Sequence, residues 1–259
     1  MPDLFLQLTD DSMEDADEIA NLTDEDALEV LAEGEFVGSK LIPWGSNYSF
    51  AVAIEDAAGR EQLAIYKPRD GENPLYDFPH GTLYLREVAA YRLSKLLDWG
   101  LVPPTLVREG PMGVGSLQLY KAPVEHDVNC DPRDYWSRRS IDVERMVLFD
   151  HVANNADRKL SHCLLDRHGA IWGIDHGLCF NIEMKLRTVL WQFIGGPVHD
   201  DLVADLVRLR ARESDLRTEM EPLLSDREVD ALIRRIEDFI ADPSYPLLNP
   251  HRNIPYGWW

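Results

Sequence analysis

Residues 36–67 alternate between hydrophobic and polar positions with the period of two that is typical of β-strands. Turn-forming residues such as Gly45 and Gly59 interrupt this alternation. Because short connections join neighbouring strands in antiparallel order, the pattern predicts an antiparallel meander. Its parts are, in order, a strand at 36–42, a turn at 44–47, a strand at 48–54, a turn at 56–59 and a strand at 62–67.

Further along the chain, apolar residues recur every three or four positions, which is the spacing of an amphipathic helix. Thr82 is suited to cap the first such helix, and Ser225 with Glu228 forms a capping box in front of the last. Strands followed by helices indicate an α+β protein with two lobes. The predicted elements are a helix at 82–99, strands at 105–108 and 116–120, a helix at 140–153, a hairpin at 162–175 and a helix over 229–240.

Acidic residues are concentrated at the start of the chain. Residues 1–36 contain 13 Asp and Glu and no Lys or Arg, and the whole chain has 46 acidic and 26 basic residues. We expect residues 1–22 to form a flexible acidic arm, because they have few apolar groups to offset the entropy of ordering them. Residues 23–122 are then the N-lobe, and residues 123–259 are the C-lobe.

The composition also excludes several classes of protein. With 259 residues, 45% of them hydrophobic, the chain is long enough to bury a full core. No apolar run reaches the roughly 18 residues of a membrane span, and the start of the chain lacks the basic segment of a signal peptide. Cys130, Cys163 and Cys179 show no CxxC spacing and are typical of buried thiols in a reducing compartment. We therefore expect a cytoplasmic protein without stable membrane insertion.

The net charge of −20 limits the ligands that the chain can bind. Such a chain repels nucleic acid and anionic membrane surfaces at long range, so nucleic acid is not an expected partner. An anionic ligand such as a nucleotide requires a local pocket of Lys, Arg or metal that overcomes this field.

Two charged residues lie in otherwise apolar surroundings. Lys67 ends the third predicted strand on the face that carries Leu63 and Ile65, so alternation points its side chain inward. A buried ammonium needs an acid or a phosphate as its partner. Glu87, early in the helix at 82–99, can supply that acid. The alternatives are that Lys67 extends past the strand end into solvent and that Glu87 is an ordinary exposed helix residue.

The hairpin at 162–175 brings polar residues at its two ends together. Its turn lies at 167–169, so residues whose numbers sum to about 337 face one another, and His162 faces Asp175 within one step of register. Asp157 lies in the polar loop just before the hairpin. A carboxylate in the position of Asp175 binds a metal or caps a turn, but turn capping does not explain Asp157.

Four short motifs follow one another along the chain. They are Tyr66-Lys67-Pro68, Arg86-Glu87, Asn155-Ala156-Asp157-Arg158 and Ile174-Asp175-His176-Gly177. In this order and spacing they resemble the ATP site of the phosphatidylinositol 3-/4-kinase-like superfamily, which is also similar to HipA-type kinases. The resemblance covers roughly residues 35–240. It implies a protein-kinase-like fold with an antiparallel-sheet N-lobe and a mainly helical C-lobe.

The same resemblance implies an ATP- and Mg²⁺-dependent phosphotransferase. In such kinases a strand lysine holds the α/β-phosphates and pairs with a helix glutamate, here Lys67 and Glu87. The loop acid, here Asp157, orients or deprotonates the acceptor hydroxyl, and the acid after the hairpin, here Asp175, binds Mg²⁺. The further residues expected to contact ATP are Ser46, Asn47, Gln118 and Tyr120.

Two departures from the family pattern bear on activity. The chain has no G-x-G-x-x-G loop, so the turn at 44–47 is expected to cover the phosphates. His162 stands where the relatives carry a metal-binding Asn, and imidazole is a poor Mg²⁺ ligand but an acceptable Mn²⁺ ligand. His162 therefore ligates metal, contacts phosphate or marks weakened catalysis.

The alternatives to a kinase are an AMP transferase on the same fold and a nucleotide-binding pseudokinase. The negative charge favours a protein or a small hydroxyl compound over a lipid as acceptor.

Overall fold

The computed structural model describes residues 22–124 and 132–257. These residues form two units, one comprising the described residues up to Val88 together with Pro103–Ala122, and the other comprising Ala89–Val102 and the described residues from Pro123 onward. Helix α3 (Leu83–Leu96) contributes its first turns to the first unit and its remainder to the second. Apart from Leu22, the predicted acidic arm lies outside the described residues.

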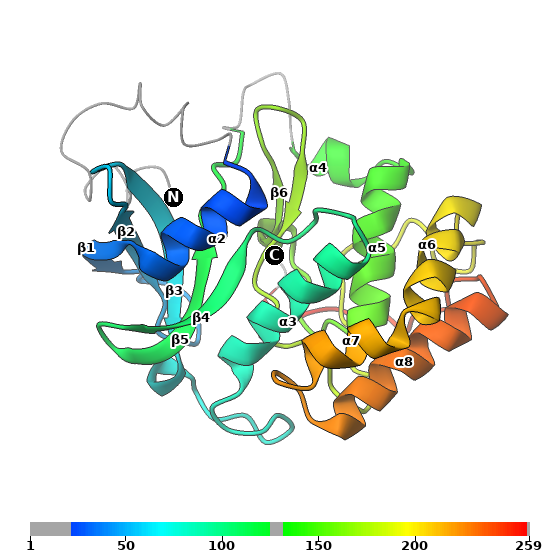
Figure 1. Ribbon diagram of the computed structural model, residues 1–259. Coiled ribbons are helices and arrows are strands. Elements are labelled where there is room, and N and C mark those ends of the chain that lie inside the picture. Colours follow the sequence, from blue (N-terminus) through cyan, green and yellow to red (C-terminus); the bar gives the residue numbers. More distant parts are fainter. Residues whose placement is uncertain (1–21, 125–131, 258–259) are drawn as a thin grey trace. The chain divides into compact units, whose positions relative to one another are not determined.

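The first unit is built on an antiparallel sheet with the strand order β1-β2-β3-β5-β4 (Figure 1). The first three strands form the predicted meander, and their observed limits differ from the predicted ones by no more than two residues. The last two strands form a hairpin whose second strand, not its first, pairs with β3. The strands are β1 (Glu35–Leu41), β2 (Phe50–Glu55), β3 (Glu61–Pro68), β4 (Thr105–Gly110) and β5 (Gly113–Leu119).

Helix α2 (Asp24–Glu33), which the hydrophobic pattern did not predict, covers one face of this sheet. The side chain of Thr23 caps it by accepting a hydrogen bond from the backbone N–H of Asp26 at 3.1 Å. Of its ten residues only Ala27 and Leu31 are fully buried, and acidic residues surround them, which hides the helical period in the sequence. The core of the unit is α2 together with Val52, Ile54, Ala64, Tyr66, Leu117 and Leu119.

The alternation along β3 places Lys67 differently from the prediction. Ala64 and Tyr66 point into the core beneath α2, whereas Leu63, Ile65 and Lys67 share the opposite face and are each only half-buried. The prediction that Lys67 lies on the same face as Leu63 and Ile65 is correct, but that face is not the one that packs into the main core. Lys67 therefore keeps 24% of its side chain exposed at the end of the strand.

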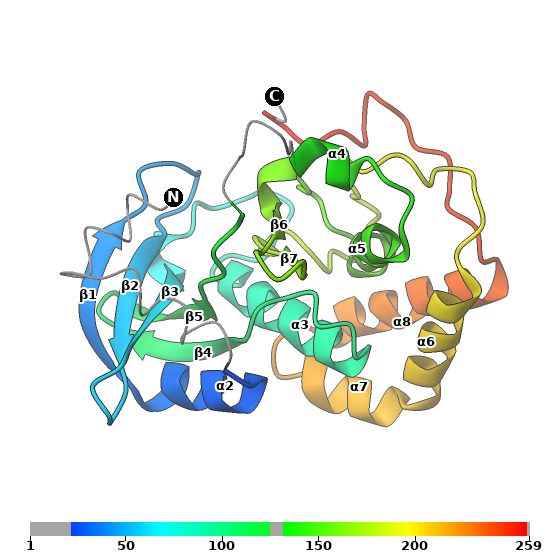
Figure 2. The same cartoon turned by 90° about the horizontal axis from the view of Figure 1, so that it is seen from above.

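The second unit is mainly helical. Helix α5 (Ile141–Ala153) is its central element, since almost all of its residues from Val143 onward are buried, and the side chain of Ser140 caps it. Helix α8 (Asp226–Ala241) packs against α5 and α6, and its predicted capping box is present (Figure 2). The other elements are α4 (Pro132–Trp136), the 3-10 turn η4 (Leu160–His162), β6 (Cys163–Leu165), β7 (Ile171–Gly173), α6 (Asp200–Ala211) and α7 (Glu213–Met220).

Cys163 and Cys179 are buried free thiols, as predicted, while Cys130 lies outside the described residues. Within residues 22–124 and 132–257, no helix has the length and apolar character needed to cross a bilayer.

Candidate functional site

In the first unit, the end of β3 and the start of α3 meet through an ion pair. Nζ of Lys67 lies 2.5 Å from Oε1 of Glu87, which is 3% exposed. The start of α3 is held in place by Glu72, whose Oε1 accepts a hydrogen bond from the backbone N–H of Tyr84 at 2.8 Å. Burial raises the pKa of Glu72. The predicted pairing is therefore present, and Glu87 is not an ordinary exposed helix residue.

The turn between β1 and β2 is tied to the segment that follows β3. Oδ1 of Asn47 accepts a hydrogen bond from the backbone N–H of Asn73 at 2.8 Å, and the N–H of Tyr48 donates to the carbonyl of Gly71 at 2.9 Å. Since the oxygen of Asn47 is engaged in this way, its amide NH₂ is the part of the side chain able to donate to a phosphate. Ser46 is exposed at the tip of the turn.

Gln118 and Tyr120 occupy the end of β5 and the residue after it. Nε2 of Gln118 donates to Oγ1 of Thr105 at 2.9 Å, so the buried amide nitrogen is engaged within the sheet. The Gln118 oxygen and the second N–H of its amide are the groups that can contact a ligand. The backbone N–H of Tyr120 donates to the carbonyl of Leu63 at 2.9 Å, and burial raises the pKa of the Tyr120 phenol, which stays a hydrogen-bond donor.

In the second unit, the loop after α5 begins with a residue in the left-handed conformation. Asn154 has φ of 54°, and its side chain donates to the carbonyls of Asn181 and Glu183 and accepts from the N–H of Lys185. Asn155 follows, and its Oδ1 accepts a hydrogen bond from the backbone N–H of Asp157 at 2.9 Å. The two asparagines thus fix the path of the loop that carries Asp157.

Asp157 is a largely buried carboxylate with a lysine beside it. Oδ2 of Asp157 lies 2.9 Å from Nζ of Lys159. Burial raises the pKa of Asp157 above its ordinary value of 3.8, and the hydrogen bond and charge of Lys159 counteract part of that rise. A carboxylate with a raised pKa is a better proton acceptor than an exposed one.

The hairpin of β6 and β7 brings His162 and Asp175 together as predicted. Leu164 pairs with Trp172, so the residue numbers sum to 336, one step below the predicted register. Nε2 of His162 lies 3.2 Å from Oδ2 of Asp175, and Nδ1 of His162 lies 3.0 Å from the carbonyl oxygen of Asp157. The imidazole therefore connects the loop acid to the acid that follows the hairpin.

The donor atoms of this pair fit a divalent cation. A carbonyl oxygen only accepts, so Nδ1 of His162 carries a proton and donates to Asp157. Nε2 faces the Asp175 carboxylate, and when Nε2 carries no proton it offers a lone pair to a cation beside that carboxylate. In the part of the chain that the structure describes, no cluster of three or more His, Cys, Asp or Glu side chains could hold a metal ion by itself. Mg²⁺ is commonly held by one or two carboxylates and by substrate phosphates. This pair supplies one carboxylate and an imidazole, and the imidazole suits Mn²⁺ better than Mg²⁺.

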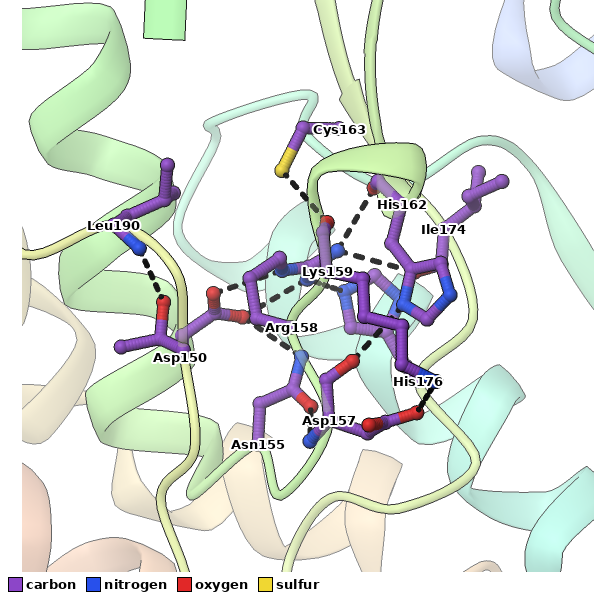
Figure 3. Close-up of polar contacts among 11 residues, drawn as sticks. Asp150, Asn155, Asp157, Arg158, Lys159, His162, Cys163, Ile174, His176 and Leu190 are labelled. Carbon is purple, nitrogen blue, oxygen red and sulfur yellow. Dashed lines mark hydrogen bonds and ion pairs between the residues drawn. The ribbon is translucent and has the colours of Figure 1, made fainter. Parts of the chain in front are cut away.

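Arg158 belongs to the Asn155-Ala156-Asp157-Arg158 motif, but the sequence pattern predicts no role for it and none for Asp150. In the structure Arg158 is fully buried and paired with Asp150 of α5 (Figure 3). The burial of Arg158 depends on helix α5 and the hairpin, which are distant from it in the sequence. The one local signal for its role is that it directly follows Asp157.

Comparison with known proteins identifies relatives of this chain. No family model matches it. The chain is 36% identical to Protein Rv2133c of Mycobacterium tuberculosis over 88% of this chain and 93% of that protein. It is 24% identical to Phosphatidylinositol 4-kinase gamma 3 of Arabidopsis thaliana over 55% of this chain, but it spans only 33% of that longer protein.

Solved structures with the same fold are kinases or their relatives, at sequence identities that carry information about the fold alone. The Golgi casein kinase with Mn/ADP bound has a TM-score of 0.54, 13% identity, and coverage of 84% of this chain and 74% of that one. Hydra Fam20 with sugar has a TM-score of 0.51, 13% identity, and coverage of 92% and 93%. The proinflammatory kinase CtkA of Helicobacter pylori has a TM-score of 0.50, 12% identity, and coverage of 83% and 94%.

The predicted α+β class, with an antiparallel-sheet N-lobe and a mainly helical C-lobe, is thus confirmed as a protein-kinase-like fold. The family follows from the full-length relative. The chain belongs to the family of Protein Rv2133c of Mycobacterium tuberculosis.

Proposed function

We propose that the protein is an ATP- and Mg²⁺-dependent phosphotransferase of the phosphatidylinositol 3-/4-kinase-like superfamily, acting on a hydroxyl acceptor. The observation that carries this proposal is the contact of His162 with both Asp157 and Asp175. One unit has a lysine paired with a buried glutamate, and the other has a loop acid beside a two-ligand metal position. Phosphoryl transfer needs both sets of groups.

Each residue has a distinct role in this proposal. Lys67, oriented by Glu87, neutralises charge on the α/β-phosphates of ATP, and Ser46 and Asn47 donate to the phosphates from the turn. Gln118 and Tyr120 contact the nucleoside. Gln118 makes this contact through its oxygen or its second amide N–H, because the first N–H already donates to Thr105.

Asp175 and His162 would hold Mg²⁺, or Mn²⁺ because of the imidazole, and the bound ion would supply charge neutralisation to the phosphates. Asp157 aligns the acceptor hydroxyl and takes its proton. The acceptor oxygen forms a bond to the γ-phosphorus while the bond from that phosphorus to the β–γ bridging oxygen breaks, and ADP leaves. Lys159 stabilises the ionised form of Asp157 before the proton arrives.

The acceptor is a protein or a small hydroxyl compound in this proposal. The net charge of −20 disfavours approach to an anionic lipid surface. The Arabidopsis relative is named for a lipid substrate, but this chain spans only a third of its length.

His162 motivates two alternative functions on the same fold. A histidine in place of a metal-binding asparagine fits a pseudokinase that binds nucleotide without turnover, and the same fold can also transfer AMP. Three outcomes separate these functions when the purified protein is incubated with ATP and Mg²⁺ or Mn²⁺. Release of ADP supports the kinase, and release of pyrophosphate with AMP joined to the acceptor indicates nucleotidyl transfer.

A nucleotide-dependent thermal shift without any product indicates the pseudokinase. Asp157→Asn is the matched control, because a contaminating ATPase is unaffected by it. Absence of both a thermal shift and a product would overturn the proposal.

A further inference from the structure

Arg158 is a completely buried cation that is paired with a buried acid. Its Nε donates to Oδ2 of Asp150 at 2.8 Å, and its Nη2 donates to Oδ1 of the same carboxylate at 2.9 Å (Figure 3). The relative exposure of the two side chains is 0% and 1%. A buried ion pair contributes little net stability, since desolvation offsets its Coulomb energy. The remaining hydrogen bonds of the guanidinium therefore indicate what the pair does.

Those remaining hydrogen bonds reach both sides of the proposed metal position. Nη1 donates to the carbonyl of His162 at 2.8 Å and to the carbonyl of Ile174 at 3.1 Å, and Nη2 lies 2.8 Å from Nε2 of His176. Arginine has no acceptor, so Nε2 of His176 accepts this hydrogen bond. Ile174 and His176 are the two neighbours of Asp175 in the chain.

Asp175 itself has an unusual backbone conformation. Its φ is 61°, in the left-handed region that residues other than glycine rarely adopt. Such a conformation persists where the surrounding structure holds it, and here one guanidinium holds the residue on either side.

The carboxylate of Asp150 also extends the network to the loop acid. Nδ2 of Asn155 donates to Oδ1 of Asp150 at 2.9 Å, and Oδ1 of Asn155 in turn accepts from the backbone N–H of Asp157. One buried carboxylate on α5 thereby connects, through two side chains, to Asp157, His162 and the neighbours of Asp175.

We infer that Asp150, Arg158 and His176 are positioning residues, which hold Asp157, His162 and Asp175 in the arrangement that binds the divalent cation. This inference rests on the proposed function. His176 is the contact to test, because removing Asp150 or Arg158 leaves an unpaired buried charge that endangers folding. His176→Leu removes the acceptor, whereas His176→Gln keeps an oxygen that can accept from Arg158.

The experiment measures binding of Mn²⁺ in the presence of ADP by electron paramagnetic resonance, without any turnover. We expect His176→Leu to weaken Mn²⁺ binding by about 10- to 100-fold, as outer-shell substitutions do, and His176→Gln to restore most of the affinity. Hydrogen exchange of the peptide that covers residues 173–177 should be faster in His176→Leu even without metal.

A second buried contact in the same unit provides the control. The hydroxyl of Tyr245 donates to Oε1 of Glu144 at 3.3 Å, so Tyr245→Phe lowers stability without touching the network. Equal loss of Mn²⁺ affinity in Tyr245→Phe and His176→Leu would overturn the inference. So would unchanged Mn²⁺ binding in His176→Leu when the natural protein binds, and the proposed function would then still stand. Failure of the natural protein to bind Mn²⁺ with ADP would overturn both.

Discussion

Nζ of Lys67 lies 2.5 Å from a carboxylate oxygen of Glu87, a residue twenty positions further along the chain and almost fully buried. The lysine ends a strand and the glutamate lies near the start of a helix, so the pair joins the sheet of the first unit to α3. Because Lys67 keeps part of its side chain exposed, it can contact an anionic ligand while it remains paired.

Replacing this lysine should remove most of the affinity for nucleotide without unfolding the protein. We expect Lys67→Met to lower affinity for ATP at least tenfold, since a charged hydrogen bond to phosphate contributes roughly 1.5–3 kcal/mol. Isothermal titration with Mg-ATP measures the change, and circular dichroism checks the fold. Lys95→Met, an exposed lysine in the last turn of α3, is the control. A folded Lys67→Met protein with unchanged binding and activity contradicts the assigned role.

The two acids of the second unit should separate binding from turnover. Asp175→Asn is expected to abolish metal-dependent binding of ATP, because it removes a ligand charge from the metal position. Asp157→Asn should bind Mg-ATP normally and lose turnover, because it can no longer accept the acceptor proton. Titration of both variants with Mg-ATP distinguishes them, and equal loss of binding in both would refute this division.

Substitutions of His162 should test whether the site binds metal and nucleotide through this residue. If its imidazole ligates metal or phosphate, His162→Asn should retain metal-supported nucleotide binding, because a carboxamide oxygen can replace the ring as a ligand. His162→Leu should lose that binding, since it offers no lone pair. Should both variants bind and turn over ATP as the natural protein does, His162 is only a packing residue and its contact with Asp175 is without function.

The pH dependence of turnover should report on Asp157 and Lys159. Asp157 must be ionised to accept a proton, so turnover falls as the pH drops through its pKa, which burial raises above 3.8. Lys159 lowers that pKa by hydrogen bond and charge, and Lys159→Met should therefore move the acid limb of kcat to higher pH. Lys185→Met, on a neighbouring loop, should leave the limb in place. A limb that does not move in Lys159→Met argues against Asp157 as the proton acceptor.

Acid should destabilise the second unit through a buried histidine. Burial lowers the pKa of His151 from 6.5 to about 4, and its ring packs edge-on against Phe239 and Tyr245. Below pH 6.5 the His151 ring takes up a proton in the unfolded chain but not in the folded one. The stability that depends on this ring is therefore fully present above pH 6.5 and is lost as the pH falls toward 4. Between pH 7 and pH 5 this histidine lowers the free energy of unfolding by about 2 kcal/mol.

We expect His151→Phe to reduce the loss of unfolding free energy between these two pH values by about that amount, as measured by urea denaturation. His168→Gln, at the exposed turn of the hairpin, should not change it. If the natural protein and His151→Phe lose the same stability on acidification, other groups cause the effect.

The sequence by itself determined the elements whose signals lie within a few residues. Alternation predicted β1 to β3, the Ser225 and Glu228 pair predicted the start of α8, and the turn at 167–169 placed His162 beside Asp175 to within one step of register. These features depend on backbone geometry and on contacts between near neighbours in the chain, so local residue types are sufficient to predict them.

Only the tertiary structure decided the contacts between distant segments. Helix α2 is stabilised through Ala27 and Leu31 against the sheet, β5 pairs with β3 although β4 comes first, and Arg158 joins α5 to both ends of the hairpin. An arginine in a polar loop looks solvated in the sequence. It becomes a buried structural centre because Asp150 compensates its charge and two backbone carbonyls complete its hydrogen bonds, and these partners meet only when the chain has folded.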